Sequence, residues 1–393
     1  MKKIAFGCTL LNRGLAGEGI DGIGHYCQEL LAEYGEDPGN LEILPYSFGY
    51  PNQFSGETKA FLTSQTTSEY AKYPLYLALA YAGISARNSA NNHLDAFKNA
   101  DLIHAPDHLI PMLRSSTNRL NKIPLIASIM DVIPISHPQF IRSKFARAKA
   151  LIWKSLSRNA NHIITISEFS KQEIARHMQY PLEQISAIPL GIDKQYFEPI
   201  GSEKIAATLK KFAIKGKFFL SIGTVQPRKN LARILQAHTN LPHNLAKEFP
   251  LVLVGRFAWD DGDIIQAIKR GVAADECIWI NYVSDEEKRC LLQAAFALAF
   301  ISLYEGFGLP MLEAFASGAP VICSNTTAMP ELAGDAALQV DPLALDEITV
   351  AMQSLINDPH LHERLRLAGI KKAQAFTWQK TWHSSRAIYE HFF

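Results

Sequence analysis

Short apolar runs, each followed by a polar or glycine-containing loop and then a helix-like segment, recur along the whole chain. This alternation is typical of α/β proteins, in which buried parallel strands read as continuous apolar runs. The predicted strands of the first half are 4–8, 41–45, 101–104, 123–129, 162–166 and 185–189. Those of the second half are 218–222, 251–254, 278–281, 296–303 and 321–323. We therefore expect open sheets whose loops at the carboxyl ends of the strands carry the functional residues.

The chain of 393 residues is long enough for two domains, and the predicted strands fall into two sets. Pro199 and Gly201 break the regular pattern between these sets. We predict an N-terminal domain over 1–197, a C-terminal domain over 198–376 and a terminal helix over 377–393. The irregular polar stretch 51–91 is expected to be an insertion.

Composition excludes several classes of protein. The 39 Lys and Arg residues against 38 Asp and Glu residues give a formal net charge of +1, whereas a general nucleic-acid binder would be clearly basic. The five cysteines show neither metal-site spacing nor a disulfide framework, which favours a reducing cytoplasm and no metal. The longest apolar window, 291–304, is too short to span a bilayer, and the N-terminal run is too short for a signal peptide.

The stretch 301–324 carries two carboxylates in otherwise apolar surroundings. Glu305 lies in a loop with two glycines, and Glu313 lies in the short helix expected after it. Carboxylates accept hydrogen bonds from sugar or ribose hydroxyls, and the free N–H groups at a helix start can bind phosphate. The alternative is a pair of solvated glutamates at a strand–helix joint.

Two cations, Arg228 and Lys229, follow the predicted strand 218–222 and precede a helix expected from Leu231. Cations at a helix N-terminus oppose the usual preference for acidic residues there. A bound anion would resolve this conflict, so the pattern predicts a phosphate site. A solvated surface is the alternative.

The pattern E-G-F-G-L-P-x-L-E-A-x-A-x-G, which begins at Glu305 and ends at Gly318, resembles the signature of the retaining GT-B glycosyltransferases of family 4. The segments 164–170 (I-T-I-S-E-F-S) and 188–193 (I-P-L-G-I-D) are similar to the family too, so the resemblance covers most of the chain. It implies two Rossmann-like α/β domains whose parallel sheets face each other across a cleft, with a terminal helix that crosses back to the first domain. It also implies transfer of a sugar from a nucleotide diphosphate donor to a glycan or lipid-linked acceptor.

The resemblance assigns a role to each donor-side motif. Arg228 and Lys229, in the P-R-K-N motif, would hold the diphosphate, Glu305 the hydroxyls of the transferred sugar and Glu313 the ribose hydroxyls. The remaining donor-binding candidates lie in glycine loops and at strand ends: Gly22, Gly24, Thr224, Gly255, Arg256, Tyr282, Val283, Phe307, Gly308 and Leu309. Ser284 and Glu287 also fit a capping box. Helix capping is therefore a purely structural explanation for the polar residues at this strand end.

Residues 22–26 (G-I-G-H-Y) resemble a family loop that closes over the donor phosphates and the acceptor, which makes His25 and Tyr26 acceptor-side candidates. A mobile surface loop is the alternative. The insertion 51–91 is expected near the acceptor.

His104 and Asp131 lie at predicted strand ends and are further acceptor-side candidates. The family often has His-Asp or Tyr-Asp where this chain has Met130-Asp131, so a histidine at that position is missing. We favour Asp131 as the fourth catalytic residue beside Arg228, Lys229 and Glu305. A structural histidine is the alternative for His104.

Basic and aromatic residues interleave over 139–158, which predicts a helix. Such a helix can lie on an anionic membrane surface, which leaves peripheral membrane contact open. A solvated helix face is the slightly preferred alternative.

The motif variants look most like bacterial mannosyltransferases of polysaccharide assembly. They favour GDP-mannose as donor, with UDP-sugars close behind. Rival interpretations are a sugar-nucleotide epimerase or hydrolase of the same fold, and a non-catalytic sugar-nucleotide sensor. A Rossmann-type dehydrogenase is disfavoured, because the first glycine loop does not have the G-x-G-x-x-G spacing.

Overall fold

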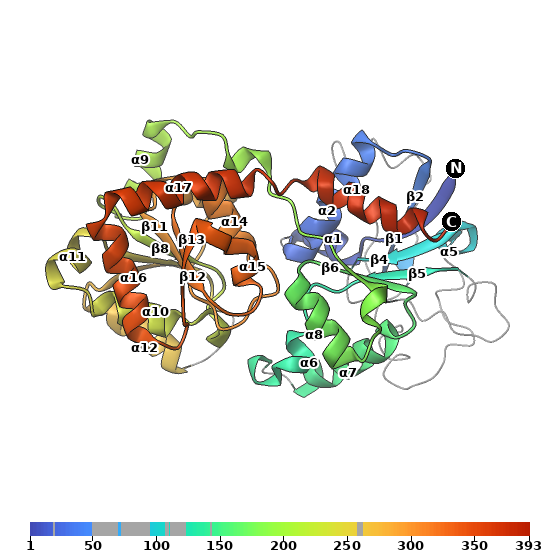
Figure 1. Ribbon diagram of the computed structural model, residues 1–393, viewed down its shortest axis with the longest axis horizontal. Helices are drawn as coiled ribbons and strands as arrows, with labels where there is room; N and C mark the ends of the chain where they lie inside the picture. Colours follow the sequence, from blue (N-terminus) through green and yellow to red (C-terminus); the bar gives the residue numbers. More distant parts are fainter. Residues whose placement is uncertain are drawn as a thin grey trace. The chain divides into compact units, whose positions relative to one another are not determined.

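The computed structural model describes residues 1–18, 20–48, 70–71, 95–106, 110, 123–141, 144–257 and 262–393. The chain forms two compact units (Figure 1). The first combines Met1–Gly191 with Trp378–Phe393, and the second is Ile192–Thr377. We predicted the division after residue 197, whereas the observed division comes before Ile192. Most of the expected insertion 51–91 lies outside the described residues.

The described strands of the first unit form a seven-stranded parallel sheet with the order β3-β2-β1-β4-β5-β6-β7. Ala5 in β1 pairs with Ile103 in β4, and Ile103 pairs in turn with Leu125 in β5. All three side chains are buried. The strands are β1 (Lys2–Gly7), β2 (Leu41–Phe48), β3 (Tyr70–Ala71), β4 (Leu102–Ala105), β5 (Leu125–Ser128), β6 (His162–Thr165) and β7 (Ile185–Ala187).

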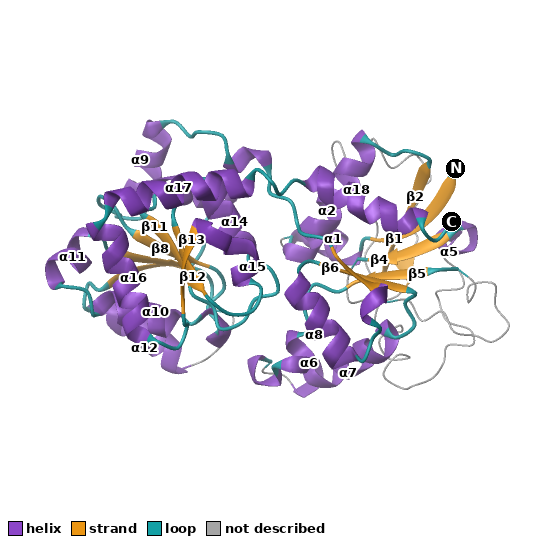
Figure 2. Ribbon diagram, viewed as in Figure 1, coloured by secondary structure: helices purple, strands orange, loops and turns teal. Residues whose placement is uncertain are grey.

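Helices pack around this sheet (Figure 2). Those described are α1 (Thr9–Arg13), α2 (Gly22–Glu36), α5 (Asp95–Asn99), α6 (Ile133–Ser136), α7 (Lys144–Ser157), α8 (Glu168–Met178) and α18 (Trp378–Glu390). The expected basic helix is thus present as α7, and its contact with a membrane stays a prediction. No helix in the described part of the chain is long and apolar enough to cross a membrane.

The C-terminal helix α18 is anchored on the first unit next to α2. The indole N–H of Trp382 donates to the Asp37 carbonyl at 3.0 Å, and Arg386 pairs with the Asp37 carboxylate at 3.1 Å. Trp382 and Tyr34 also meet edge to face. A buried aromatic ring and an ion pair therefore fix the last helix to a unit whose other residues end at Gly191.

The second unit is a six-stranded parallel sheet with the order β10-β9-β8-β11-β12-β13. Its strands are β8 (Phe219–Ile222), β9 (Leu251–Val254), β10 (Cys277–Ile280), β11 (Ala297–Phe300), β12 (Val321–Ser324) and β13 (Ala337–Val340). Its helices are α9 (Ser202–Lys211), α10 (Leu231–Thr239), α11 (His243–Glu248), α12 (Gly262–Ala273), α13 (Asp285–Ala294), α14 (Leu309–Ala316), α15 (Met329–Ala333), α16 (Leu345–Asn357) and α17 (Pro359–Ala373).

The apolar runs of the sequence form the buried strands of this sheet. Every residue of β8, β9, β11 and β12 is buried, as expected of strands covered by helices on both faces. The predicted strand 296–303 is shorter in the structure. Residues after Phe300 leave the sheet, because the Leu303 amide donates to the Arg228 carbonyl at 2.7 Å and Asn230 donates to the Ile301 carbonyl at 3.1 Å.

Candidate active site

The direction of winding reverses between β8 and β11 in the second unit. From β8 the chain runs outward to β9 and β10, and from β11 it runs outward the other way to β12 and β13. In open parallel sheets the loops that leave such a switch point diverge, and ligands bind beyond the carboxyl ends of those strands. The loops after β8 and β11 carry the predicted cation pair and Glu305.

These three charged side chains meet at this point. Glu305 Oε1 lies 2.5 Å from the ammonium of Lys229 and 2.8 Å from a terminal guanidinium nitrogen of Arg228. Arg228 also donates to the Tyr304 carbonyl at 3.1 Å. The structure therefore brings together the residues predicted for the diphosphate and for the transferred sugar.

Local backbone geometry fixes the two cations. Residues Pro227–Lys229 form a 3₁₀ turn that ends at Asn230, whose backbone is left-handed with φ 59°. The Asn230 side chain donates to the carbonyls of Ile301 at 3.1 Å and Pro342 at 2.8 Å. Asparagine tolerates this backbone region and ties the turn to the loop after β11, so Arg228 and Lys229 project in a set direction.

Burial and charge act in opposite directions on these groups. Burial alone would raise the pKa of Glu305, but the charges of Lys229 and Arg228 outweigh it and hold the pKa below its ordinary value. Burial lowers the pKa of Lys229, and only part of this effect is offset by Glu305. The carboxylate is thus ionised at neutral pH because two cations face it.

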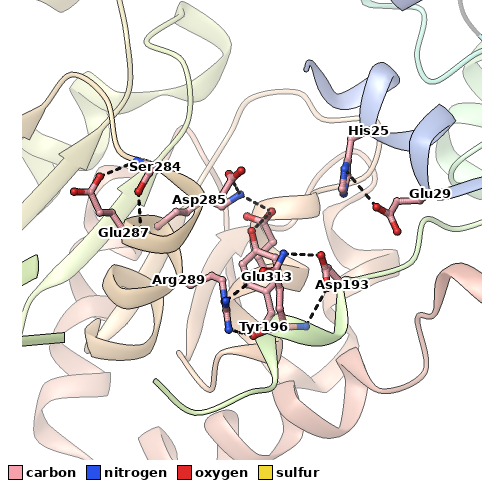
Figure 3. A network of polar contacts seen from close by, with 11 residues as sticks. His25, Glu29, Asp193, Tyr196, Ser284, Asp285, Glu287, Arg289 and Glu313 are labelled. Carbon is pink, nitrogen blue, oxygen red and sulfur yellow. Dashed lines mark hydrogen bonds and ion pairs between the residues drawn. The ribbon is translucent and has the colours of Figure 1, made fainter. Parts of the chain in front are cut away.

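The second glutamate, Glu313, has donors that the sequence did not reveal. Its Oε1 accepts the hydroxyl of Tyr196 at 3.0 Å and the ammonium of Lys288 at 2.9 Å. Figure 3 shows Tyr196 next to Glu313 in this network. Both Glu313 and Tyr196 are buried.

Glycines allow the backbones to approach closely at the same edge of the sheet. Gly255 follows β9, and a Cβ at this position would lie 1.9 Å from the Gly223 carbonyl oxygen. Gly308, with φ 111°, precedes α14, and a Cβ there would meet the Met329 side chain at 2.7 Å. Neither position accepts a side chain without movement of its neighbours.

The other donor-side candidates lie around these glycines. Arg256 covers the ring of the exposed Tyr282, with 4.5 Å between the guanidinium carbon and the ring centroid. Thr224 is exposed, and Phe307 is buried edge to face against Phe376. Val283 and Leu309 are partly exposed.

The predicted capping box at the start of α13 is confirmed. The Ser284 hydroxyl accepts the Glu287 amide at 3.2 Å, and the Glu287 carboxylate accepts the Ser284 amide at 2.8 Å. These two residues therefore cap the N-terminus of α13, which is the structural alternative named from the sequence.

In the first unit, Gly22 and Gly24 are not in a loop. They lie in the first turn of α2, whose N-cap is Asp21. The Asp21 carboxylate accepts the Gly24 amide at 2.8 Å and pairs with Arg13 at 2.7 Å. A carboxylate therefore already caps this helix start, which opposes a phosphate at the same amide groups.

The structure also corrects the acceptor-side predictions for Tyr26 and His104. His104 lies inside β4, fully buried, with its two ring nitrogens 2.8 Å from the hydroxyls of Ser128 and Tyr389. Tyr26, 2 % exposed, reaches Ser128 at 3.2 Å. Burial lowers the pKa of His104 to about 3, so the ring is neutral at pH 7. These side chains join β4, β5, α2 and α18 in the core, which favours the structural alternative for His104.

His25 and Asp131 are accessible by comparison. His25 lies in the first turn of α2, 3.8 Å from Glu29 and edge to face with Trp378. Asp131 follows β5, and its carboxylate accepts the Ile133 amide at 3.0 Å. This bond orients Asp131 at the carboxyl end of the strand. Their acceptor-side roles stay predictions.

No group of three or more His, Cys, Asp or Glu side chains among the described residues could hold a metal ion. The positive charges at the switch point come from Lys229 and Arg228.

Two family models match the chain. Residues 20–196 match the family model for Glycosyltransferase Family 4, and residues 206–372 match that for Glycosyl transferases group 1. The O-antigen chain mannosyltransferase B of Escherichia coli is 36 % identical over 280 residues, which are 71 % of each chain. The O-antigen chain mannosyltransferase RfbU of Salmonella typhimurium is 27 % identical, over 63 % of this chain and 62 % of that one.

Among solved structures, Anabaena HepE in complex with UDP and glucose matches with a TM-score of 0.71 at 15 % identity, over the full length of both chains. This confirms the predicted GT-B fold. The sequence matches show that the chain belongs to glycosyltransferase family 4, the glycosyl transferases group 1.

Proposed function

We propose that this glycosyltransferase moves mannose from GDP-mannose, with retention of configuration, to a glycan or lipid-linked acceptor in cell-surface polysaccharide synthesis. The observation that carries the proposal is the meeting of Arg228, Lys229 and Glu305 at the switch point of the second unit. The choice of mannose is supported by the O-antigen mannosyltransferases of Escherichia coli and Salmonella typhimurium among the relatives.

Each charged residue has one task in this proposal. Arg228 and Lys229 stabilise the charge that grows on the diphosphate as the bond to the sugar breaks, because they are fixed before the reaction starts. Glu305 accepts hydrogen bonds from hydroxyls of the transferred sugar, and Glu313 accepts those of the ribose. Asp131 orients the acceptor hydroxyl and takes part in its loss of a proton.

Affinity for the donor tests the proposal first. Thermal unfolding should be measured with GDP-mannose, GDP, UDP-glucose, UDP and ADP in parallel. A ligand at 100 times its dissociation constant adds about 2.7 kcal/mol to the free energy of unfolding, so the preferred nucleotide is easily recognised. We expect the largest shift with GDP-mannose. A larger shift with UDP-glucose would move the proposal to a UDP-sugar donor.

Turnover separates transfer from the rival activities. A transferase releases GDP from GDP-mannose in step with a new mannosylated product. Release of GDP without any acceptor would indicate a hydrolase, and a changed sugar nucleotide would indicate an epimerase. Binding without turnover, with mannose-terminated acceptors present, would indicate a sensor.

A further inference from the structure

Glu313 is held on one side only, by two donors from different elements. Tyr196 lies in the 3₁₀ turn Lys194–Tyr196, and Lys288 lies in the first turn of α13. Both donate to Oε1 of Glu313, at 3.0 and 2.9 Å. In the described part of the chain, no hydrogen bond to Oε2 is found. The carboxylate thus has one oxygen, Oε1, that is fixed by two donors.

The two donors also support each other. The Lys288 ammonium lies 5.3 Å from the centroid of the Tyr196 ring, a cation–π contact. The Tyr196 side chain is buried, and burial together with the negative charge of Glu313 raises its pKa. The hydroxyl therefore keeps its proton at neutral pH and donates a hydrogen bond to Glu313.

The turn that carries Tyr196 is itself fixed to α13. Arg289, the neighbour of Lys288, donates to the side-chain carbonyl of Gln195 at 3.2 Å and to its backbone carbonyl. The Asp193 carboxylate accepts the Gln195 backbone amide at 3.0 Å. These contacts fix Gln195, the residue directly before Tyr196, in the turn.

We propose that Tyr196 and Lys288 are positioning residues for Glu313: they hold its Oε1 so that Oε2 is directed at the ribose hydroxyls of the donor. This inference rests on the proposed ribose role of Glu313. It adds that recognition of the ribose depends on a turn at the very start of the second unit and on the first turn of α13. Neither residue touches the reacting atoms.

The test compares a nucleoside diphosphate with its 2′,3′-dideoxy analogue by calorimetry, with the base that binds most tightly, GDP being expected. The variants are Tyr196→Phe, which keeps the ring, and Lys288→Met, which keeps the aliphatic stem. Wild type should prefer the ribose form by at least about 10-fold, the scale of a hydrogen bond to a charged group. This preference should fall about 3- to 10-fold in each variant, while affinity for the dideoxy analogue stays unchanged.

Two controls match the variants. Tyr180→Phe removes a buried hydroxyl that donates to the Ala160 carbonyl in the first unit, and Lys210→Met removes an exposed lysine of α9. Both should keep the wild-type preference. A variant that merely misfolds would lose affinity for both nucleotides, which distinguishes damage from lost positioning.

Glu313→Gln separates failure of the inference from failure of the ribose assignment. If Glu313→Gln loses the preference but Tyr196→Phe and Lys288→Met keep it, the positioning role is wrong and the ribose role stands. If wild type itself does not prefer the ribose form, both are wrong, whereas the assignment of the diphosphate to Arg228 and Lys229 is untouched.

Discussion

The ammonium of Lys229 lies 2.5 Å from Glu305 Oε1, although the two residues are 76 positions apart in the chain. Each follows a strand at the switch point, and each is largely buried. Arg228 shares the same carboxylate oxygen. Glu305 therefore has a second task besides the proposed contact with sugar: it balances two cations that would otherwise repel each other.

The balancing task predicts a pH-dependent loss of stability in Glu305→Gln. Because the pKa of Glu305 is lowered in the folded protein, its stabilising contribution is complete well above the ordinary value of about 4.5 and is lost as pH falls below it. Denaturant unfolding of wild type and Glu305→Gln should differ by about 3–5 kcal/mol at pH 7, the scale for breaking a buried charge pair.

The difference between the two proteins should shrink as pH falls from about 4.5 towards 3, because wild type loses the same charge. A difference that is equal at pH 7 and pH 3.5 would show that the ionised carboxylate does not stabilise the cluster. Glu363→Gln, on the exposed face of α17, serves as the control, because an exposed ion pair contributes little to the free energy of unfolding.

The buried position of His104 predicts that it contributes to stability and not to transfer. Tyr389→Phe leaves His104 Nδ1 without its partner and should lower the free energy of unfolding by about 1–2 kcal/mol. The rate of sugar transfer by the folded protein should stay near that of wild type. A large loss of the transfer rate in Tyr389→Phe, with an unchanged free energy of unfolding, would instead support an acceptor-side role for His104.

His104 also makes stability depend on pH. Its folded pKa is lowered by burial to about 3, whereas the unfolded side chain titrates near 6.5. The unfolded chain therefore binds one more proton between these values, so stability falls as pH drops from about 6.5 towards 3. His104→Gln should be less stable at pH 7 and should show a flatter dependence in this window. If the free energy of unfolding of the variant depends on pH as steeply as that of wild type, groups other than His104 cause this dependence.

Asp131→Asn tests the acceptor side. It keeps the shape of the side chain and the bond to the Ile133 amide but removes the charge. Transfer should fall by about 10²–10⁴-fold if the carboxylate takes part in proton transfer, with nucleotide affinity nearly unchanged. If Asp131→Asn transfers sugar at the wild-type rate while a stably folded His104→Ala does not, the role belongs to His104.

Much of the second unit's site could be predicted from the sequence, because its signals are local. Strand-length apolar runs place Arg228, Lys229 and Glu305 directly after strands, and two cations before a helix already indicate an anion site. The family motif then assigns them roles. Their mutual contact follows once β8 and β11 are neighbours.

Other parts of the site depend on contacts that no local pattern shows. Tyr196 is 117 positions from Glu313 in the sequence, and Lys288 lies in a charged segment that is typical of a solvated surface. His104 looked like a strand-end residue because its partner Tyr389 is 285 positions away. Asp21 was different, since an aspartate just before a helical pattern is an N-cap signal that could have been recognised.

The central claim, that the cluster at the switch point holds the diphosphate of the donor, is tested most directly by nucleotide affinity in Arg228→Ala and Lys229→Ala. Calorimetry should compare GDP with guanosine, which lacks phosphates, and Lys247→Ala on the exposed face of α11 is the control. We predict that each variant loses about 10- to 100-fold in affinity for GDP, the scale of a charged hydrogen bond, with guanosine affinity and the control unchanged. Wild-type affinity for GDP in both variants would contradict the account.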